Sequence, residues 1–361
     1  MENIQYRELF FSFLRLGSLG FGGPLALISL MEQEYVVQRK WVSHQAFEQA
    51  LVLCKMLPGP TSFQMALWIG NTLRGKWGGI LAGISFILPT AILLGLFAKH
   101  YDQLMAFTHS DSLLSGIRVG VLVIIVQTLA SLSKPFRKDI SAWYVVLPAL
   151  VSAAVLPSLE PLIILAGGIV GITLRAAECP KWALKAPLVP LLLSIFWVHF
   201  KGGAFVFGPG LTILSTLQHD VVQKFQWLSQ KEFLDAFALS QAIPGPVTTL
   251  SSFIGYQIAG LSGSLAALFG MYLPGAVLVL FVLPRFSRLL EEKLWIKPFY
   301  QGAFCSVVGC LGASAIPIGI STLNKTEHQV LFVLLLLIQF FKRTPVWMTL
   351  SLGALISWFN Q

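Results

Sequence analysis

The segment Leu57-Pro58-Gly59-Pro60-Thr61-Ser62 decides the fold, because its Pro-Gly-Pro triplet returns later in the chain as Pro244-Gly245-Pro246. The two triplets are separated by 244 − 58 = 186 positions. At the same offset, glycine, aromatic and serine residues meet identical residues in the second half: Gly17 and Gly203, Phe21 and Phe207, Trp41 and Trp227, Ser43 and Ser229. This many matches at one offset indicates that the chain consists of two copies of one repeat.

The composition of the chain places both copies in a lipid bilayer. Of the 361 residues, 55% are hydrophobic and only 11% are charged, and the mean hydropathy is +0.75. An average soluble protein is about one quarter charged, which excludes the soluble, secreted, disordered and collagen-like classes. The apolar stretches are continuous and do not alternate with a period of two, which excludes a transmembrane β-barrel. We therefore expect an all-α polytopic membrane protein.

The charged and sulfur-containing residues give no sign of nucleic-acid binding, metal binding or catalysis. The net charge is 25 − 16 = +9, but the basic residues lie in short breaks between apolar runs, where membrane topology explains them. The four cysteines form no C-x-x-C pair, so we interpret them as packing residues. The sequence lacks H-E-x-x-H, G-x-S-x-G and P-loop motifs. We expect no cofactor, no metal, no nucleic-acid partner and no enzymatic activity.

The lysines and arginines of equivalent loops favour opposite sides of the membrane in the two copies. Cytoplasmic loops collect these residues, which puts the N-terminus and the loops 134–138 and 285–297 in the cytoplasm and the C-terminus outside. This opposite bias is typical of inverted-topology repeats. Inversion requires an odd number of spans between equivalent points, and the apolar stretch 186–200 can supply a linker span. The expected organisation is a repeat at 1–185, that linker, and a repeat at 201–361, with about 10–13 membrane segments.

Each copy opens with two apolar stretches that are interrupted by residues incompatible with a continuous helix. The first break is Gly20-Phe21-Gly22-Gly23-Pro24, with Phe207-Gly208-Pro209-Gly210 as its counterpart, and the second break is the Pro-Gly-Pro triplet. Proline removes a backbone donor and glycine permits unusual backbone angles, so we expect helices that stop inside the membrane and restart. Broken helices at matching positions of inverted repeats indicate the substrate site of a transporter. For a single triplet, a packing kink is the competing interpretation.

The restarted helices predict an anion as the ligand. A helix N-terminus presents unpaired backbone N–H groups and the positive end of the dipole, which suits a small oxyanion. Hydroxyl groups follow both triplets, and Lys55 adds a cation where the second copy has Gln241, although Lys55 has a second interpretation as an interface residue. The candidate binding residues, expected to meet in one cavity near the midplane, are Gly22, Gly23, Lys55, Pro58, Gly59, Thr61, Ser62, Gln64, Gly208, Gly245, Thr248 and Thr249.

Charged residues in or beside apolar stretches are candidates for coupling transport to protons. Charges inside a membrane are functional candidates by default. Glu34 and Asp220 lie near the ends of apolar runs, where cap or interface roles compete, and Asp235 beside Lys231 and Glu232 has the same alternative. The coupling candidates are Glu34, Glu48, Arg118, Asp220 and Asp235.

The broken segments and their surroundings resemble the chromate ion transporter (CHR) family. The resemblance covers nearly the whole chain and rests, in order, on residues 20–24, 31–34, 39–41, 57–62, Gln64 and Gly70, with 207–210 and 242–246 in the second half. Phe63 and 207–210 depart from the usual pattern of the family. The resemblance implies export of chromate, a tetrahedral dianion shaped like sulfate, across a bacterial inner membrane by a secondary transporter that uses the proton motive force. Transport of another small anion such as sulfate, by a transporter or a channel, is the alternative, and a homodimer is left open.

Overall fold

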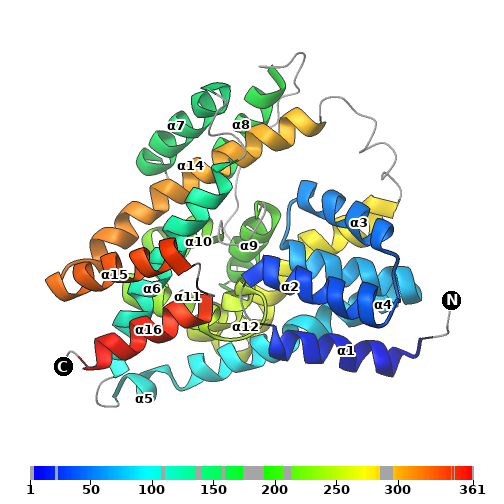
Figure 1. Cartoon of the computed structure of the whole chain (residues 1–361), viewed down its shortest axis with the longest axis horizontal. Helices are drawn as coiled ribbons and strands as arrows, with labels where there is room; N and C mark the ends of the chain where they lie inside the picture. Colours follow the sequence, from blue (N-terminus) through cyan, green and yellow to red (C-terminus); the bar gives the residue numbers. More distant parts are fainter. Residues whose placement is uncertain are drawn as a thin grey trace.

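The computed structural model describes residues 4–20, 23–106, 110–134, 140–156, 159–173, 191–206, 213–284, 296–342, 344 and 346–359. Every regular element within these ranges is helical (Figure 1). The expectation of an all-α chain is confirmed.

The first repeat opens with short helices, continues with a very long one and ends with four more described helices. Its elements are α1 (Tyr6–Leu19), α2 (Gly23–Met31), the π-helix η1 (Glu32–Gln38), α3 (His44–Met56), α4 (Thr61–Lys99), α5 (Tyr101–Ala106), α6 (Ser110–Leu132), α7 (Ile140–Val155) and α8 (Glu160–Thr173).

The second repeat follows the same order. Its elements are α9 (Leu191–Ala204), α10 (Ile213–Gln218), the π-helix η4 (His219–Lys224), α11 (Gln230–Ala242), the 3-10 helix η5 (Val247–Thr249), α12 (Leu250–Val277), the π-helix η6 (Leu278–Val282), α14 (Ile296–Thr322), α15 (Thr326–Lys342) and α16 (Val346–Phe359). The starts of α11 and α16 follow those of α3 and α8 by 230 − 44 = 186 and 346 − 160 = 186 residues. The duplication seen in the sequence is therefore present in the helices.

Matching local sequences start the equivalent helices α3 and α11. Ser43 precedes α3, and its side chain accepts a hydrogen bond from the backbone N–H of Ala46. Ser229 precedes α11 and forms a reciprocal capping box with Glu232. These caps satisfy N–H groups that a helix start leaves unpaired, so both helices begin at the same point of the repeat.

The long elements α4 and α12 are each folded into two arms by a glycine with a positive φ angle. Gly75 has a φ of 65° and Gly260 a φ of 59°. The arms of α4 pack through Gly70 against Gly78, and those of α12 pack in the same way eight residues apart. Residues eight apart in an unbroken helix are separated by about 12 Å, so this contact means that the chain turns back. Each element is a short arm that starts after the Pro-Gly-Pro triplet, followed by a long arm.

Four helices among the described residues are long and apolar enough to cross a membrane: Thr61–Lys99, Ser112–Leu132, Val247–Val282 and Gln301–Thr322. Five shorter apolar helices accompany them. The opening helices α1 and α3 have 14 and 13 residues, whereas a span usually needs about 20. They are too short for a full crossing, as expected of broken helices, and the chain is a multi-pass membrane protein.

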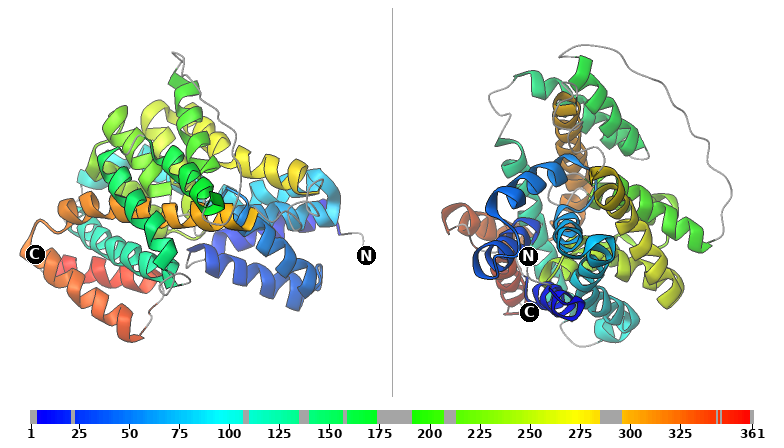
Figure 2. Two further views of the ribbon diagram at one scale, coloured as in Figure 1. Left: turned by 90° about the horizontal axis from the view of Figure 1, so that it is seen from above. Right: turned by 90° about the vertical axis from the view of Figure 1, so that its right-hand side faces the viewer.

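Helices of the two repeats are exchanged across the molecule. In Figure 1, α8 of the first repeat packs against α14 of the second, and α16 of the second packs against α6 of the first. Figure 2 shows the orange α14 beside the green α7 and α8 from two further directions. Glycines lie at both contacts, Gly167 with Gly302 and Gly353 with Gly116. Such reciprocal contacts between equivalent residues are the property of a two-fold axis, here one that relates the two repeats.

The long arms of α4 and α12 run in opposite directions across this axis. The Lys76 ammonium at the start of the long arm of α4 lies 4.2 Å from the centroid of the Phe281 ring in η6, which directly follows α12. At the far end of α4, Gln257 Nε2 donates to the carbonyl of Ala98 at 2.8 Å, close to the bend of α12. Antiparallel equivalent helices are the arrangement that inverted repeats require.

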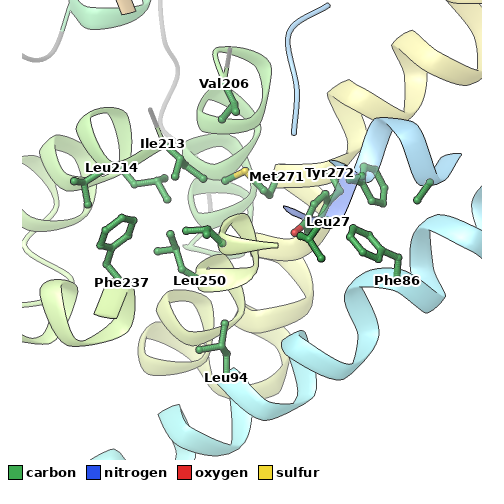
Figure 3. Packing of buried hydrophobic residues seen from close by; sticks show 14 of the residues in the cluster. Leu27, Phe86, Leu94, Val206, Ile213, Leu214, Phe237, Leu250, Met271 and Tyr272 are labelled. Carbon is green, nitrogen blue, oxygen red and sulfur yellow. The ribbon is translucent and has the colours of Figure 1, made fainter. Parts of the chain in front are cut away.

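One large hydrophobic core joins the two repeats (Figure 3). It contains Leu27 and Phe86 of the first repeat together with Met271 of the second. A side chain on Gly17 would overlap the backbone of Phe86, and one on Gly203 would overlap the backbone of Met271. The glycines of α1 and α9 thus allow equally close packing against α4 and α12.

Some sequence predictions fall outside the described residues. Gly22 and Gly208 lie there, as do most of the two loops assigned to the cytoplasm. Residues 186–190 of the expected linker also lie there, whereas 191–200 form most of α9, which packs against α12 as α1 packs against α4. The described part of that apolar stretch therefore serves as the first helix of the second repeat.

Candidate functional site

Both Pro-Gly-Pro triplets form the turn between a helix that stops and a helix that restarts. The first lies between α3 and α4, and the second between α11 and η5. The central glycines are buried and have positive φ angles, 131° for Gly59 and 113° for Gly245. Residues with a side chain rarely adopt such angles, which explains the glycine between the two prolines.

Each triplet is attached to the other repeat by a backbone hydrogen bond. The N–H of Gly59 donates to the carbonyl of Val206 at 2.7 Å, and the N–H of Gly245 donates to the carbonyl of Gly20 at 2.8 Å. Both acceptor residues are buried: Gly20 is the first residue of the first break in its repeat, and Val206 directly precedes the equivalent break. The broken segments are therefore interlocked in two reciprocal pairs in the interior. Whether the triplets share one cavity stays a prediction.

Neither turn has room for a side chain on its glycine. A Cβ atom on Gly59 would lie 2.6 Å from the amide nitrogen of Gln64 and 3.1 Å from the Cα of Gly275. A Cβ atom on Gly245 would overlap the hydroxyl of Thr90. Because Gln64 and Thr90 both belong to α4, this helix contacts both turns.

The helix α4 also supplies hydrogen-bond donors to both turns. Gln64 Nε2 donates to the carbonyl of Pro58 at 2.9 Å, and Thr90 Oγ1 donates to the carbonyl of Pro244 at 2.7 Å. Gln64 Oε1 is buried without a hydrogen-bond partner among the described residues. Leaving a buried acceptor unpaired costs free energy, so this oxygen is an open polar position beside the first turn.

The hydroxyl-bearing candidates are buried at the starts of the restarted helices: Thr61, Ser62, Thr248 and Thr249. Thr248 Oγ1 lies 2.8 Å from the hydroxyl of Tyr272, and Thr249 Oγ1 donates to the carbonyl of Pro246 at 2.6 Å. An anion at this place has to exchange such bonds for its own. Oxyanion binding by the four residues stays a prediction.

Lys55 lies in the last turn of α3 with an exposed side chain. Its counterpart Gln241 is buried at the end of α11, where its amide nitrogen has no hydrogen-bond partner in the described part of the chain. The two copies therefore differ in exposure as well as in charge. From an exposed position, Lys55 acts on the buried turn only through long-range attraction.

The buried carboxylate of Asp235 on α11 is paired with Arg118 on α6. Arg118 Nε lies 2.5 Å from one carboxylate oxygen, and the hydroxyl of Tyr101 donates to the other at 2.6 Å. The side chain of Asp235 is 0% exposed and that of Arg118 is 15% exposed. Burial, together with the bond to Asp235, raises the pKa of Tyr101, so its hydroxyl keeps its proton and remains a donor. Two of the coupling candidates thus form one ion pair that is buried inside the protein. A role of Asp235 in coupling stays a prediction.

The other coupling candidates lie apart from this pair. Glu34 is half-buried in an ion pair with Arg39, and Glu48 is exposed beside a histidine of its own helix. Asp220 is buried and paired with Lys201, and one of its carboxylate oxygens lacks a hydrogen-bond partner among the described residues. In that same part of the chain, no group of three or more His, Cys, Asp or Glu side chains is placed to hold a metal ion.

Three residues contribute hydroxyl groups to these sites but were not predicted from the sequence. Thr90, Tyr101 and Tyr272 bond the second triplet, Asp235 and Thr248, respectively. A single hydroxyl in an apolar run is indistinguishable from a packing residue until the fold brings its partner to it. The duplication offered one clue, since Thr90 occurs where the second copy has glycine.

Comparison with known proteins identifies the same duplication of the chain. The sequence model of a family described as chromate transporter matches residues 7–172 and 193–358, two segments whose starts are 193 − 7 = 186 residues apart. Residues 193–200, assigned to the linker from the sequence, fall inside the second match. No solved structure matches the chain.

The chain is also similar to curated proteins along most of its length. It is 31% identical over 330 residues to a chromate transport protein of Cupriavidus metallidurans, covering 86% of this chain and 82% of that protein. It is 28% identical over 349 residues to a chromate transport protein of Pseudomonas aeruginosa, covering 89% and 83%. Both family matches contain a complete set of broken helices and one Pro-Gly-Pro turn. The chain therefore belongs to the chromate transporter family.

Proposed function

We propose that the protein is a secondary transporter that exports chromate from the bacterial cytoplasm across the inner membrane. The observation that carries the proposal is the interlocking of the two broken-helix turns, whose buried helix starts suit a small oxyanion. The relatives named chromate transport proteins support chromate as the ligand. The two-fold relation of the repeats supports a mechanism in which they rock about one central site.

In the proposed site, backbone N–H groups and hydroxyls at Thr61, Ser62, Thr248 and Thr249 bind the anion. Two helix N-termini supply roughly half a positive charge each, which leaves about one negative charge of a dianion to be met. Burying that charge uncompensated is costly, and Lys55, three residues before the first triplet, is the proposed compensating cation. Partial compensation favours turnover, because a completely neutralised ion would leave slowly.

The proton motive force is the proposed energy source, with the Asp235 carboxylate as the proton acceptor. Asp235 is fully buried and its charge is matched by Arg118. Protonation would remove the attraction between the two side chains and free the guanidinium for another anion. Asp220, the second buried acid with a basic partner, is the reserve candidate.

The test is uptake of labelled chromate into inverted membrane vesicles from cells that produce the protein. An imposed gradient with protons concentrated inside the vesicles, which is the direction of the cellular force, should accelerate uptake. Vesicles without the protein are the control. Equal chromate uptake with and without the protein would sink the proposal of export.

Sulfate transport is the second candidate function. Helix N-termini and hydroxyl groups bind an anion according to its charge and tetrahedral shape, and sulfate has both in common with chromate. In the same vesicles, unlabelled sulfate in excess should compete with labelled chromate. If labelled sulfate enters faster than chromate at equal concentration, sulfate is the preferred substrate and chromate is a mimic.

A further inference from the structure

A hydrophobic groove runs between α4 and α12 and continues along η6. It has a volume of about 380 Å³, and every described residue that lines it is hydrophobic. The groove is open on one side, because the lining side chains of Ile84 on α4 and Phe269 on α12 are 50% and 62% exposed. In a multi-pass membrane protein, an open apolar surface of this kind faces the acyl chains of the bilayer.

The floor of the groove borders the predicted anion site. The buried rings of Phe63 and Tyr272 line the groove, with their centroids 4.5 Å apart. The hydroxyl of Tyr272 lies 2.8 Å from Oγ1 of Thr248. Tyr272 therefore contacts the groove through its ring and a predicted anion ligand through its hydroxyl.

One end of the groove carries a cation. Phe281 of η6 lines this end, and the ammonium of Lys76 lies 4.2 Å from the centroid of the Phe281 ring. The neighbouring Arg74 donates to the carbonyl of Ile4, which places this end beside the N-terminal segment. By the lysine and arginine bias of the loops, this is the cytoplasmic end.

The equivalent positions at the other end carry no charge. The offset after the triplets is 185, so Arg74 and Lys76 correspond to Ala259 and Leu261. The duplication supplies the same bend at both ends, so the fold itself does not require a cation at either. A lysine at one end of a hydrophobic groove matches a ligand that has one anionic end and a long apolar tail.

The distance from the charged end to Tyr272 suits a chain from one leaflet. Phe281 and Tyr272 are 281 − 272 = 9 residues apart, which corresponds to about 14 Å along a helix. The hydrocarbon core of a bilayer is about 30 Å thick. An acyl chain whose head group lies at Lys76 therefore reaches Tyr272 near the midplane.

We propose that this groove binds an anionic phospholipid of the cytoplasmic leaflet, with the phosphate at Lys76 and one acyl chain between α4 and α12. Lysines near the membrane surface attract anionic head groups, and the apolar lining accepts the chain. The chain packs against Phe63 and Tyr272, so the lipid supports the outer side of the predicted anion site. The inference does not depend on chromate being the substrate.

The test is native mass spectrometry of the purified full chain, titrated in detergent with phosphatidylglycerol or with phosphatidylcholine of the same acyl chains. The first phosphatidylglycerol should bind about fivefold more tightly than phosphatidylcholine, as expected for one lysine near an anionic head group. Lys76→Gln should remove that preference. Ile84→Trp, which fills the groove, should weaken the binding of both lipids.

Two matched controls accompany these variants. Lys99→Gln removes an exposed lysine at the far end of α4, and Ile92→Trp adds the same ring at a position of α4 that is 53% exposed. Neither residue lines the groove, so both variants should bind the two lipids as the wild type does.

Four results would overturn the site. The first is equal affinity of the wild type for the two lipids, and the second is a Lys76→Gln variant that keeps the preference for phosphatidylglycerol. The third is equal weakening by Ile84→Trp and Ile92→Trp, which would place the chain elsewhere. The fourth is a lipid-free dimer of the wild type that Ile84→Trp converts to monomers, because a second copy would then cover the groove. Lipid binding as expected without chromate uptake into vesicles would contradict only the proposed export.

Discussion

The two Pro-Gly-Pro turns have the same backbone conformation, but different side chains donate hydrogen bonds to them. Both have a glycine with positive φ and a hydrogen bond to the opposite repeat. The carbonyl of Pro58 accepts from Gln64, whose counterpart at an offset of 186 is Leu250. The carbonyl of Pro244 accepts from Thr90, whose counterpart is Gly275, because the second copy lacks one residue after its triplet and the offset there is 185, as in Pro89 and Pro274.

This difference separates what the backbone demands from what the side chains add. Glycines and prolines recur at equivalent positions because the turn geometry needs them in both copies. The polar side chains differ, and both side chains that donate to the proline carbonyls belong to α4 of the first repeat. The ion pair of Arg118 with Asp235 follows the same rule, since Phe304 and Gln49 occupy the equivalent positions. A nearly symmetric scaffold thus carries an asymmetric set of polar groups.

One of the two largest effects is expected for Gly245→Ala. The new methyl group is placed at a φ of 113° and overlaps the hydroxyl of Thr90, so strain of about 1–2 kcal/mol adds to a packing cost of about 1–3 kcal/mol. Gly260→Ala is the matched control, because Gly260 also has a positive φ but nothing within 4 Å of its Cβ position. In thermal unfolding of the purified variants, the unfolding temperature should fall clearly further for Gly245→Ala than for Gly260→Ala. Equal losses would mean that the turn relaxes around the methyl group.

The next effect concerns the ion pair that only one copy has. Asp235→Asn leaves the Arg118 guanidinium without its carboxylate, which should destabilise the protein by about 3–5 kcal/mol. The double variant Arg118→Phe with Asp235→Gln, which introduces the residues of the other copy, should recover most of that stability. Proton-driven chromate uptake should stay low in the double variant. Full uptake by the double variant would remove both residues from the coupling mechanism.

Much of this arrangement could be predicted from the sequence, because it depends on residues with unusual backbone properties. The two repeats, the broken helices and the turns at the triplets follow from glycine and proline at one offset. The exchange of α8 and α16 between the repeats could not be predicted, since hydrophobic helices carry no signal for their partner. The bond of Tyr101 to Asp235 was missed for the same reason, because it joins residues 134 positions apart. The role of the segment 191–200 could not be decided from the sequence, because its hydrophobicity suits a linker span and the packed helix α9 equally well.

A smaller effect is expected when the two carbonyl donors are removed. Gln64→Leu copies Leu250 into the first turn and leaves the Pro58 carbonyl without its donor, while Thr90→Val does the same to Pro244. A buried acceptor left unpaired costs about 1–3 kcal/mol, so both unfolding midpoints should fall by similar amounts. If only Thr90→Val lowers the unfolding midpoint, the first turn is stabilised by its glycine contacts and its backbone hydrogen bond and does not need Gln64.

The smallest effect is expected for Lys55→Gln, which gives the first copy the glutamine that the second copy has at Gln241. Lys55 is exposed at the end of α3, so the fold should be unaffected. At a separation of about 10 Å in a water-like dielectric, a lysine attracts a dianion by about 0.8 kcal/mol, which corresponds to about fourfold in affinity. The half-saturating chromate concentration for transport should therefore rise by about that factor, and added salt should reduce the difference between the variant and the wild type. Lys99→Gln, exposed at the far end of α4, controls for a general loss of positive charge. An unchanged chromate dependence in Lys55→Gln would show that the remaining charge of the anion is met elsewhere, and Arg118 is then the cation to replace next.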